Sequence, residues 1–145
     1  WCGPCIATFP NIRKLEAHYE GYPVEIIGVT SIQGFHIDRE NNNQRVDTKG
    51  DPQKEMDLMP GFIKHMDMTW TVAFSEDSCF NPNFGVRGIP HVAIVDPAGK
   101  VRYNGLHPGG DLNEKIAKID ALLKEYGLPT PTPPDANANA ESSGN

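Results

Sequence analysis

Two cysteines, Cys2 and Cys5, are separated by two residues at the start of the chain. This spacing allows a small disulfide ring to close and to reopen by thiol exchange. If a helix begins at Cys2, its thiolate lies where backbone N–H groups and the helix dipole favour negative charge. In such a setting the pKa of a cysteine falls from about 8.5 into a range of about 3.5–7.5. The pair therefore predicts redox catalysis, with a structural disulfide clip as the alternative.

A metal site is a third interpretation of the pair, and the rest of the sequence gives it little support. Zinc would need two further ligands. His91 and Cys79 are the candidates, and nothing in their spacing recommends them. We therefore expect no metal and no organic cofactor. Because Glu76 and Asp77 lie just before Cys79, their negative charge disfavours its thiolate, and we interpret Cys79 as an ordinary half-buried thiol.

The composition is that of one domain with a tail. The chain has 145 residues, a net charge of -6 and no cluster of basic residues. Nucleic acid is therefore not an expected partner. No apolar run approaches the roughly 18 residues that span a bilayer, so we expect no membrane contact within this segment.

The elements that must position the cysteines can be predicted from hydrophobic spacing. Residues 5–20 have the pattern of an amphipathic helix, in which Pro10 predicts a kink. Residues 24–30 are short and apolar, as in a strand buried on both faces. Residues 31–50 are polar and without periodicity, so they predict an inserted loop. A helix follows from residue 51, either continuous or restarting at Pro60, and then a strand over 70–74.

The second half predicts a hairpin and a final helix. Strands at 92–95 and 101–103 are joined by a turn with proline and glycine in favoured positions. Asp111 and Glu114 have capping-box spacing at the start of an amphipathic helix that ends at Gly127. Residues 128–145 are rich in proline, alanine and asparagine and contain nothing that could form a core of their own, so we expect a domain over 1–127 and a disordered tail over 128–145.

Two motifs together resemble the thioredoxin superfamily. The first is the run WCGPC from Trp1 to Cys5, and the second is Gly88-Ile89-Pro90 ahead of a predicted strand. The sequence around the second motif looks most like the TlpA/ResA-like branch. The resemblance implies an α/β thioredoxin-like fold, with a mixed sheet flanked by helices. It also implies a first strand directly before Trp1, so we expect this chain to be part of a longer protein.

The resemblance also implies roles at the first motif. Cys2 would be the attacking cysteine and Cys5 the resolving one. Trp1, Gly3 and Pro4 would shape the motif around them. The buried acid that thioredoxins use to accept the proton of the resolving cysteine would lie on the strand before Trp1, so no residue here is assigned to it.

At the second motif, the resemblance implies that Pro90 follows a cis peptide bond and that the backbone of Ile89 pairs with an extended substrate. His91 departs from the family pattern. We favour a histidine that is hydrogen-bonded at the start of the following strand. The alternative is that His91 assists proton transfer to or from Cys5.

The predicted function is dithiol–disulfide exchange with protein thiols and disulfides, in the reducing direction. A redox partner protein would supply the electrons. One alternative is a thiol peroxidase of the redoxin group, which would need a threonine upstream and an arginine nearby. Another is a thioredoxin-fold binding module with an inert cysteine pair. The resemblance implies a bacterial protein outside the cytoplasm, such as the periplasm, with a possible membrane tether before Trp1.

Overall fold

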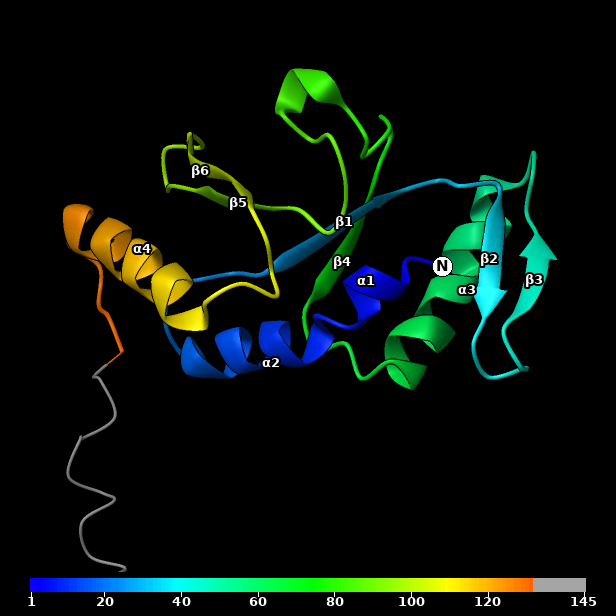
Figure 1. Ribbon diagram of the computed structural model, residues 1–145, viewed down its shortest axis with the longest axis horizontal. Coiled ribbons are helices and arrows are strands. Elements are labelled where there is room, and N and C mark those ends of the chain that lie inside the picture. Colours follow the sequence, from blue (N-terminus) through cyan, green and yellow to red (C-terminus); the bar gives the residue numbers. More distant parts are fainter. Residues whose placement is uncertain (132–145) are drawn as a thin grey trace, which may run out of the picture.

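A computed structural model describes residues 1–131 and shows short strands interleaved with four α-helices (Figure 1). The α-helices are α1 (Gly3–Ile6), α2 (Phe9–His18), α3 (Pro52–His65) and α4 (Leu112–Glu125). The strands are β1 (Ile27–Ser31), β2 (Phe35–Asp38), β3 (Gln44–Asp47), β4 (Thr71–Ser75), β5 (Val92–Val95) and β6 (Val101–Leu106). A 3₁₀ turn, η1, covers Pro82–Phe84.

The strands form three separate pairs. β1 runs parallel to β4, whereas β2–β3 and β5–β6 are antiparallel. The α/β architecture agrees with the sequence, but the single mixed sheet does not, since no ladder joins β1–β4 to β5–β6 within residues 1–131. The prediction that the first strand is buried on both faces is also wrong, because Ile27 and Val29 are 54% and 61% exposed.

The main core lies between α2 and α4. Leu15 of α2 and Tyr19, the C-cap residue of that helix, pack with Leu123 of α4, as the helical spacing of these residues predicts. The Tyr19 hydroxyl donates to the Asp120 carboxylate at 2.8 Å and is also within 3.1 Å of the Ile116 carbonyl oxygen. Burial and the neighbouring carboxylate raise the pKa of Tyr19 well above its usual range. These contacts hold the helix that follows the cysteine motif.

The kinked helix predicted over residues 5–20 is two helices. Hydrogen bonding breaks between α1 and α2, where the Thr8 hydroxyl donates to the Cys5 carbonyl at 2.7 Å. Pro10 lies in the first turn of α2, where its missing N–H costs no helical hydrogen bond. The break leaves the cysteines on a separate short helix. In contrast, α3 continues through Pro60 without a restart.

The loop predicted over residues 31–50 is a hairpin, β2–β3. Asn42 and Asn43 adopt positive φ values of 53° and 59° at its tip, so the asparagine run supplies the turn. The guanidinium of Arg45 lies 4.0 Å from the centre of the Phe35 ring. The base of the hairpin is held by Glu55 of α3, a buried carboxylate. These long-range contacts order a segment that has no apolar periodicity of its own.

The end of the domain lies beyond the predicted boundary at residue 127. Gly127 has the positive φ of 64° that ends α4. Leu128 then packs against the core, and its N–H donates to the Leu123 carbonyl at 2.8 Å. Ordered contacts therefore reach past residue 127, and residues 132–145 of the predicted tail lie outside the described residues. Over residues 1–131, the helices are too short or too polar to cross a membrane.

Candidate redox site

Cys2 and Cys5 form a disulfide at the start of α1. Cys2 is the N-cap residue, and the backbone N–H of Cys5 donates to the Cys2 sulfur at 3.2 Å. Gly3 and Pro4 are exposed in the first turn, where proline is tolerated and where glycine adds no side chain over the sulfurs. Both cysteines are half-buried. The disulfide is therefore partly buried, next to two exposed residues of its own motif.

This arrangement favours a thiolate at Cys2 when the disulfide is reduced. The Cys5 N–H that contacts the Cys2 sulfur in the oxidised protein remains a donor to that sulfur as an anion. A hydrogen bond to the charged form lowers the pKa of a thiol. Cys2 is therefore the sulfur better suited to attack.

A loop between β4 and β5 reaches the motif through an aromatic contact. The Trp1 ring stacks on the Phe80 ring with centroids 6.4 Å apart and an angle of 24° between the planes. The preceding residue, Cys79, is a free and half-buried thiol, and its backbone N–H donates to the Ser31 hydroxyl at 3.3 Å. Phe80 was not predicted as part of the site, because no spacing pattern connects a residue at position 80 with one at position 1.

The Ile89–Pro90 peptide bond is cis. His91 follows it and forms a hydrogen bond of 2.6 Å between its Nε2 and Oδ1 of Asn104 on β6. Among residues 1–131, no hydrogen bond joins His91 to either cysteine of the motif. The histidine is thus hydrogen-bonded next to the first residue of β5, as we favoured from the sequence.

Asn104 determines which tautomer the neutral His91 ring adopts. The Asn104 amide nitrogen donates to the Phe84 carbonyl at 3.0 Å, and its Oδ1 accepts from the Gly105 N–H at 3.0 Å. The amide can therefore face His91 only with its oxygen. Because that oxygen accepts, Nε2 of His91 carries a hydrogen, and the neutral ring keeps its lone pair on Nδ1. No spacing pattern in the sequence connects Asn104 with His91, so this contact was not predicted.

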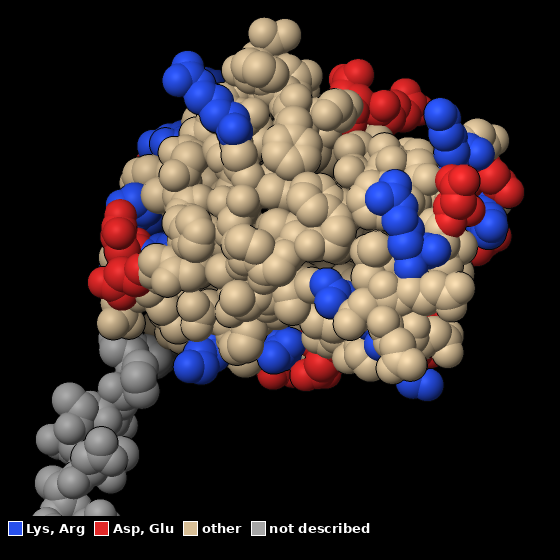
Figure 2. All heavy atoms as spheres, turned by 45° about the vertical axis from the view of Figure 1, so that its right-hand side comes forward, with Lys and Arg blue, Asp and Glu red and all other residues tan. Residues whose placement is uncertain are grey.

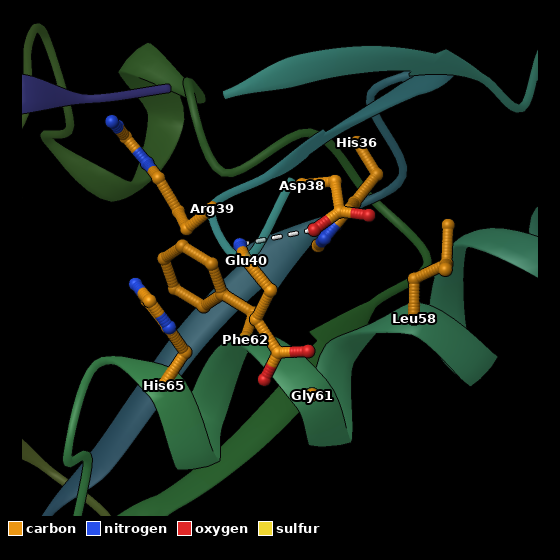
Figure 3. A pocket seen from close by; sticks show the side chains of 8 residues that line it. All are labelled: His36, Asp38, Arg39, Glu40, Leu58, Gly61, Phe62 and His65. Carbon is orange, nitrogen blue, oxygen red and sulfur yellow. Dashed lines mark hydrogen bonds between the residues drawn. The ribbon is translucent and has the colours of Figure 1, made fainter. Parts of the chain in front are cut away.

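A pocket of about 90 Å³ lies between the β2–β3 hairpin and α3 (Figure 3). Its lining residues are His36, Asp38, Arg39, Glu40, Leu58, Gly61, Phe62 and His65. They include no cysteine, so the pocket is not the redox site. Burial lowers the pKa of His36, and the nearby carboxylates of Asp38 and Glu55 oppose that effect. Among residues 1–131, no group of three or more histidine, cysteine or acidic side chains is placed to hold a metal ion.

Charged side chains are dispersed over the surface. Figure 2 shows lysines and arginines scattered singly among acidic residues around a broad uncharged area. No basic patch is visible on this face, which agrees with the net charge of -6. A nucleic-acid interface would need such a patch.

Comparison with known proteins identifies the class. Residues 1–123 match the Redoxin family, and the chain belongs to it. It is a thiol-based redox protein of the thioredoxin superfamily with an α/β thioredoxin-like fold.

The chain is also 26% identical, over 128 residues, to the protein SUPPRESSOR OF QUENCHING 1, chloroplastic, of Arabidopsis thaliana. The match covers 87% of this chain and 10% of that protein, so the chain spans about a tenth of the length of the curated relative. No solved structure matches the chain.

Proposed function

We propose that this protein is a thiol–disulfide oxidoreductase that exchanges electrons with protein cysteines through Cys2 and Cys5, in the reducing direction. The observation that carries the proposal is the disulfide at the N-cap of α1, with the Cys5 N–H directed at the Cys2 sulfur. A structural clip would need no such donor at one particular sulfur. The match of residues 1–123 to the Redoxin family gives further support.

The reaction balances without a cofactor. The Cys2 thiolate attacks one sulfur of a substrate disulfide, and the other substrate sulfur leaves as a thiolate that takes up a proton. Cys5 then loses its proton and attacks the Cys2 sulfur, which releases the second substrate thiol. Two electrons pass to the substrate and the Cys2–Cys5 disulfide forms. A dithiol partner protein returns the two electrons for the next cycle.

The finer assignment is the TlpA/ResA-like branch, with a bacterial and extracytoplasmic setting. It rests on the sequence around Gly88 to Pro90 and on the long segment between β1 and β4. In that setting, the substrates would be disulfides of exported proteins.

The test is the reduction potential of the pair, measured by equilibration with glutathione or dithiothreitol. Trp1 is a suitable fluorescent reporter because it precedes Cys2 and is 51% exposed, whereas Trp70 is buried at 6%. We expect a potential near the thioredoxin value of about -270 mV. A value near -120 mV, roughly that of a strong oxidant, would reverse the proposed direction. If the Cys2–Cys5 pair does not equilibrate with either reagent, the exchange function is excluded, and a binding module with an inert cysteine pair becomes the better interpretation.

Single cysteine variants assign the roles. Cys2→Ser should abolish exchange, whereas Cys5→Ser should accumulate a mixed disulfide between Cys2 and substrate. Cys79→Ser is the matched control and should keep full activity. If the protein consumes hydrogen peroxide rapidly and leaves protein disulfides unreduced, it is a thiol peroxidase and this proposal is wrong.

A further inference from the structure

Thr8 lies at the junction of α1 and α2, and its hydroxyl is directed back toward the cysteine motif. It is the N-cap residue of α2, where a threonine hydroxyl ordinarily accepts from an N–H in the first turn of the helix that follows. Among the described residues, the Thr8 side chain caps no N–H of α2, and its hydroxyl donates instead to the Cys5 carbonyl oxygen at 2.7 Å. The side chain therefore serves the end of α1 and not the start of α2.

The backbone of Cys5 is consequently held on both sides. Its N–H donates to the Cys2 sulfur at 3.2 Å, and its carbonyl oxygen accepts from the Thr8 N–H at 3.0 Å as well as from the Thr8 hydroxyl. α1 has only four residues, and a helix of that length is not stable by itself. The geometry of the motif therefore depends on the disulfide at the start of α1 and on Thr8 at its end.

A loop before α4 keeps Thr8 in place. Thr8 is only 7% exposed, and a Cβ on Gly109 would lie 3.2 Å from the Thr8 methyl carbon, so the loop passes close to that methyl group. The loop is itself fixed by Lys115, a buried residue of α4, whose Nζ donates to the carbonyl oxygens of Gly110 at 2.9 Å and Asp111 at 3.1 Å. Because a β-branched side chain has few χ1 states, a methyl group held by its neighbours also fixes the direction of the hydroxyl.

The hydrogen bond from Thr8 contributes more to the reduced protein than to the oxidised one. In the oxidised protein a covalent bond joins Cys2 to Cys5 and keeps the first turn closed with or without the Thr8 hydroxyl. After reduction, hydrogen bonds alone hold the Cys5 N–H at the Cys2 sulfur, where it stabilises the thiolate. A side chain that maintains this geometry stabilises the dithiol form, and stabilisation of the reduced form raises the reduction potential.

We propose that Thr8 is a positioning residue for the cysteine pair, which fixes the Cys5 carbonyl and thereby keeps the Cys5 N–H directed at the Cys2 sulfur when the disulfide is open. This inference rests on the proposed exchange function and adds how the potential of the pair is set. Thr8 acts through the backbone of Cys5 and exchanges no bond with a substrate.

The experiment is the equilibrium of the pair with glutathione, in which the protein disulfide and two glutathione thiols give the protein dithiol and one glutathione disulfide. Thr8→Val keeps the shape and the buried methyl group of the side chain but lacks the hydroxyl. Thr8→Ser keeps the hydroxyl and is the conservative rescue. Thr8→Ala also lacks the hydroxyl and repeats the test without a second methyl group.

Thr48→Val is the matched control. Thr48 is 2% exposed, and its hydroxyl donates to the Glu55 carboxylate at 2.6 Å, so this variant removes an equally buried hydroxyl outside the cysteine motif. The free energy of unfolding in urea is measured for every variant beside the equilibrium constant, which separates a loss of stability from a change in potential.

We expect Thr8→Val and Thr8→Ala to lower the equilibrium constant for reduction by about threefold to tenfold, the factor that corresponds to one neutral hydrogen bond. A tenfold change equals a fall of about 30 mV in the reduction potential. Thr8→Ser should keep the wild-type constant. Thr48→Val should lower the free energy of unfolding and leave the constant unchanged.

The outcomes distinguish this inference from the function on which it rests. An unchanged or higher constant in the variants that lack the Thr8 hydroxyl would overturn the positioning role and leave the exchange function standing. An equal fall in Thr8→Ser or in Thr48→Val would also overturn it, because the hydroxyl at position 8 would then not be the cause. Failure of the wild-type pair to equilibrate with glutathione would overturn both.

Discussion

Replacing Glu55 with alanine should destabilise the protein by about 3–5 kcal/mol, because its buried carboxylate satisfies three donors at the base of the hairpin. The side chain belongs to α3, and the residue is only 3% exposed. One carboxylate oxygen accepts from the Gln33 N–H at 2.7 Å. The other accepts from the Gly34 N–H at 2.9 Å and from the Thr48 hydroxyl at 2.6 Å. A hydrogen bond to a charged group contributes about 1.5–3 kcal/mol, and partial access of water reduces the sum.

Glu55→Gln tests the geometry more sharply. An amide NH₂ group in either position faces a backbone N–H, of Gln33 or of Gly34, and neither can turn away. We expect a loss of about 1–3 kcal/mol for this variant. Glu114→Gln is the matched control on an exposed helix face, where solvent screens the pair with Lys118 and its loss should change the stability little.

Urea unfolding followed by circular dichroism would give these free energies, and thermal unfolding should show a fall in Tm of roughly 10 °C for Glu55→Ala. If Glu55→Ala unfolds within about 0.5 kcal/mol of the wild type, the carboxylate does not anchor the hairpin. A large loss of unfolding free energy for Glu114→Gln would equally refute the reasoning, because burial would then not explain why Glu55 matters more than Glu114.

Three further predictions concern packing, pH and the redox state. Gly28→Ala should cost about 1–3 kcal/mol in urea unfolding, because a Cβ there would lie 2.9 Å from Nε1 of Trp70, whereas Gly61→Ala meets no atom within 4 Å and should be neutral or stabilising. The Lys100 N–H, together with the Tyr126 hydroxyl and Arg102, lowers the pKa of Asp96 against the opposing effect of burial. The stability from Asp96 is therefore complete above the unfolded value of about 4 and is lost as the pH falls through the lower folded pKa. Asp96→Asn should accordingly flatten the fall of Tm with acid, and an unchanged acid limb would contradict this. Reduction of the disulfide should lower stability by about 2 kcal/mol through the entropy of a four-residue ring, and a reduced form as stable as the oxidised one would contradict that estimate.

Local features of the sequence predicted much of this structure. The hairpin of β5 and β6 and the helix α4 lie where apolar spacing and turn residues placed them, because each depends on contacts between neighbours in the chain. Asp111 caps α4, although its carboxylate accepts from the Asn113 N–H and not from that of Glu114. The cysteine motif was recognisable for the same reason, since its chemistry lies within five consecutive residues.

The features that sequence reasoning missed depend on distant contacts. The β2–β3 hairpin is ordered by a carboxylate in a later helix, and no periodicity within residues 31–50 reports that. The break between α1 and α2 was predicted only as a kink, because Pro10 shows where a hydrogen bond is missing but not where the next helix begins. Phe80 and Asn104 are the clearest examples, since each acts on a residue that is far away in the chain.

The contrast between local and distant contacts also applies to the redox site, where the chemistry of the sulfurs depends on local contacts and the substrate selectivity depends on distant ones. The two sulfurs and the Cys5 N–H that favours one of them lie within four consecutive residues, so the reduction potential depends mainly on a local segment. The ring of Trp1 instead contacts Phe80 on a loop some 80 residues later, and Ser31 and Asn104 hold that loop from two further strands. Substitutions in the loop should therefore change which disulfides react without changing the potential. Substitutions at Gly3 or Pro4 should change the potential for all substrates alike, because they alter the motif that every substrate meets.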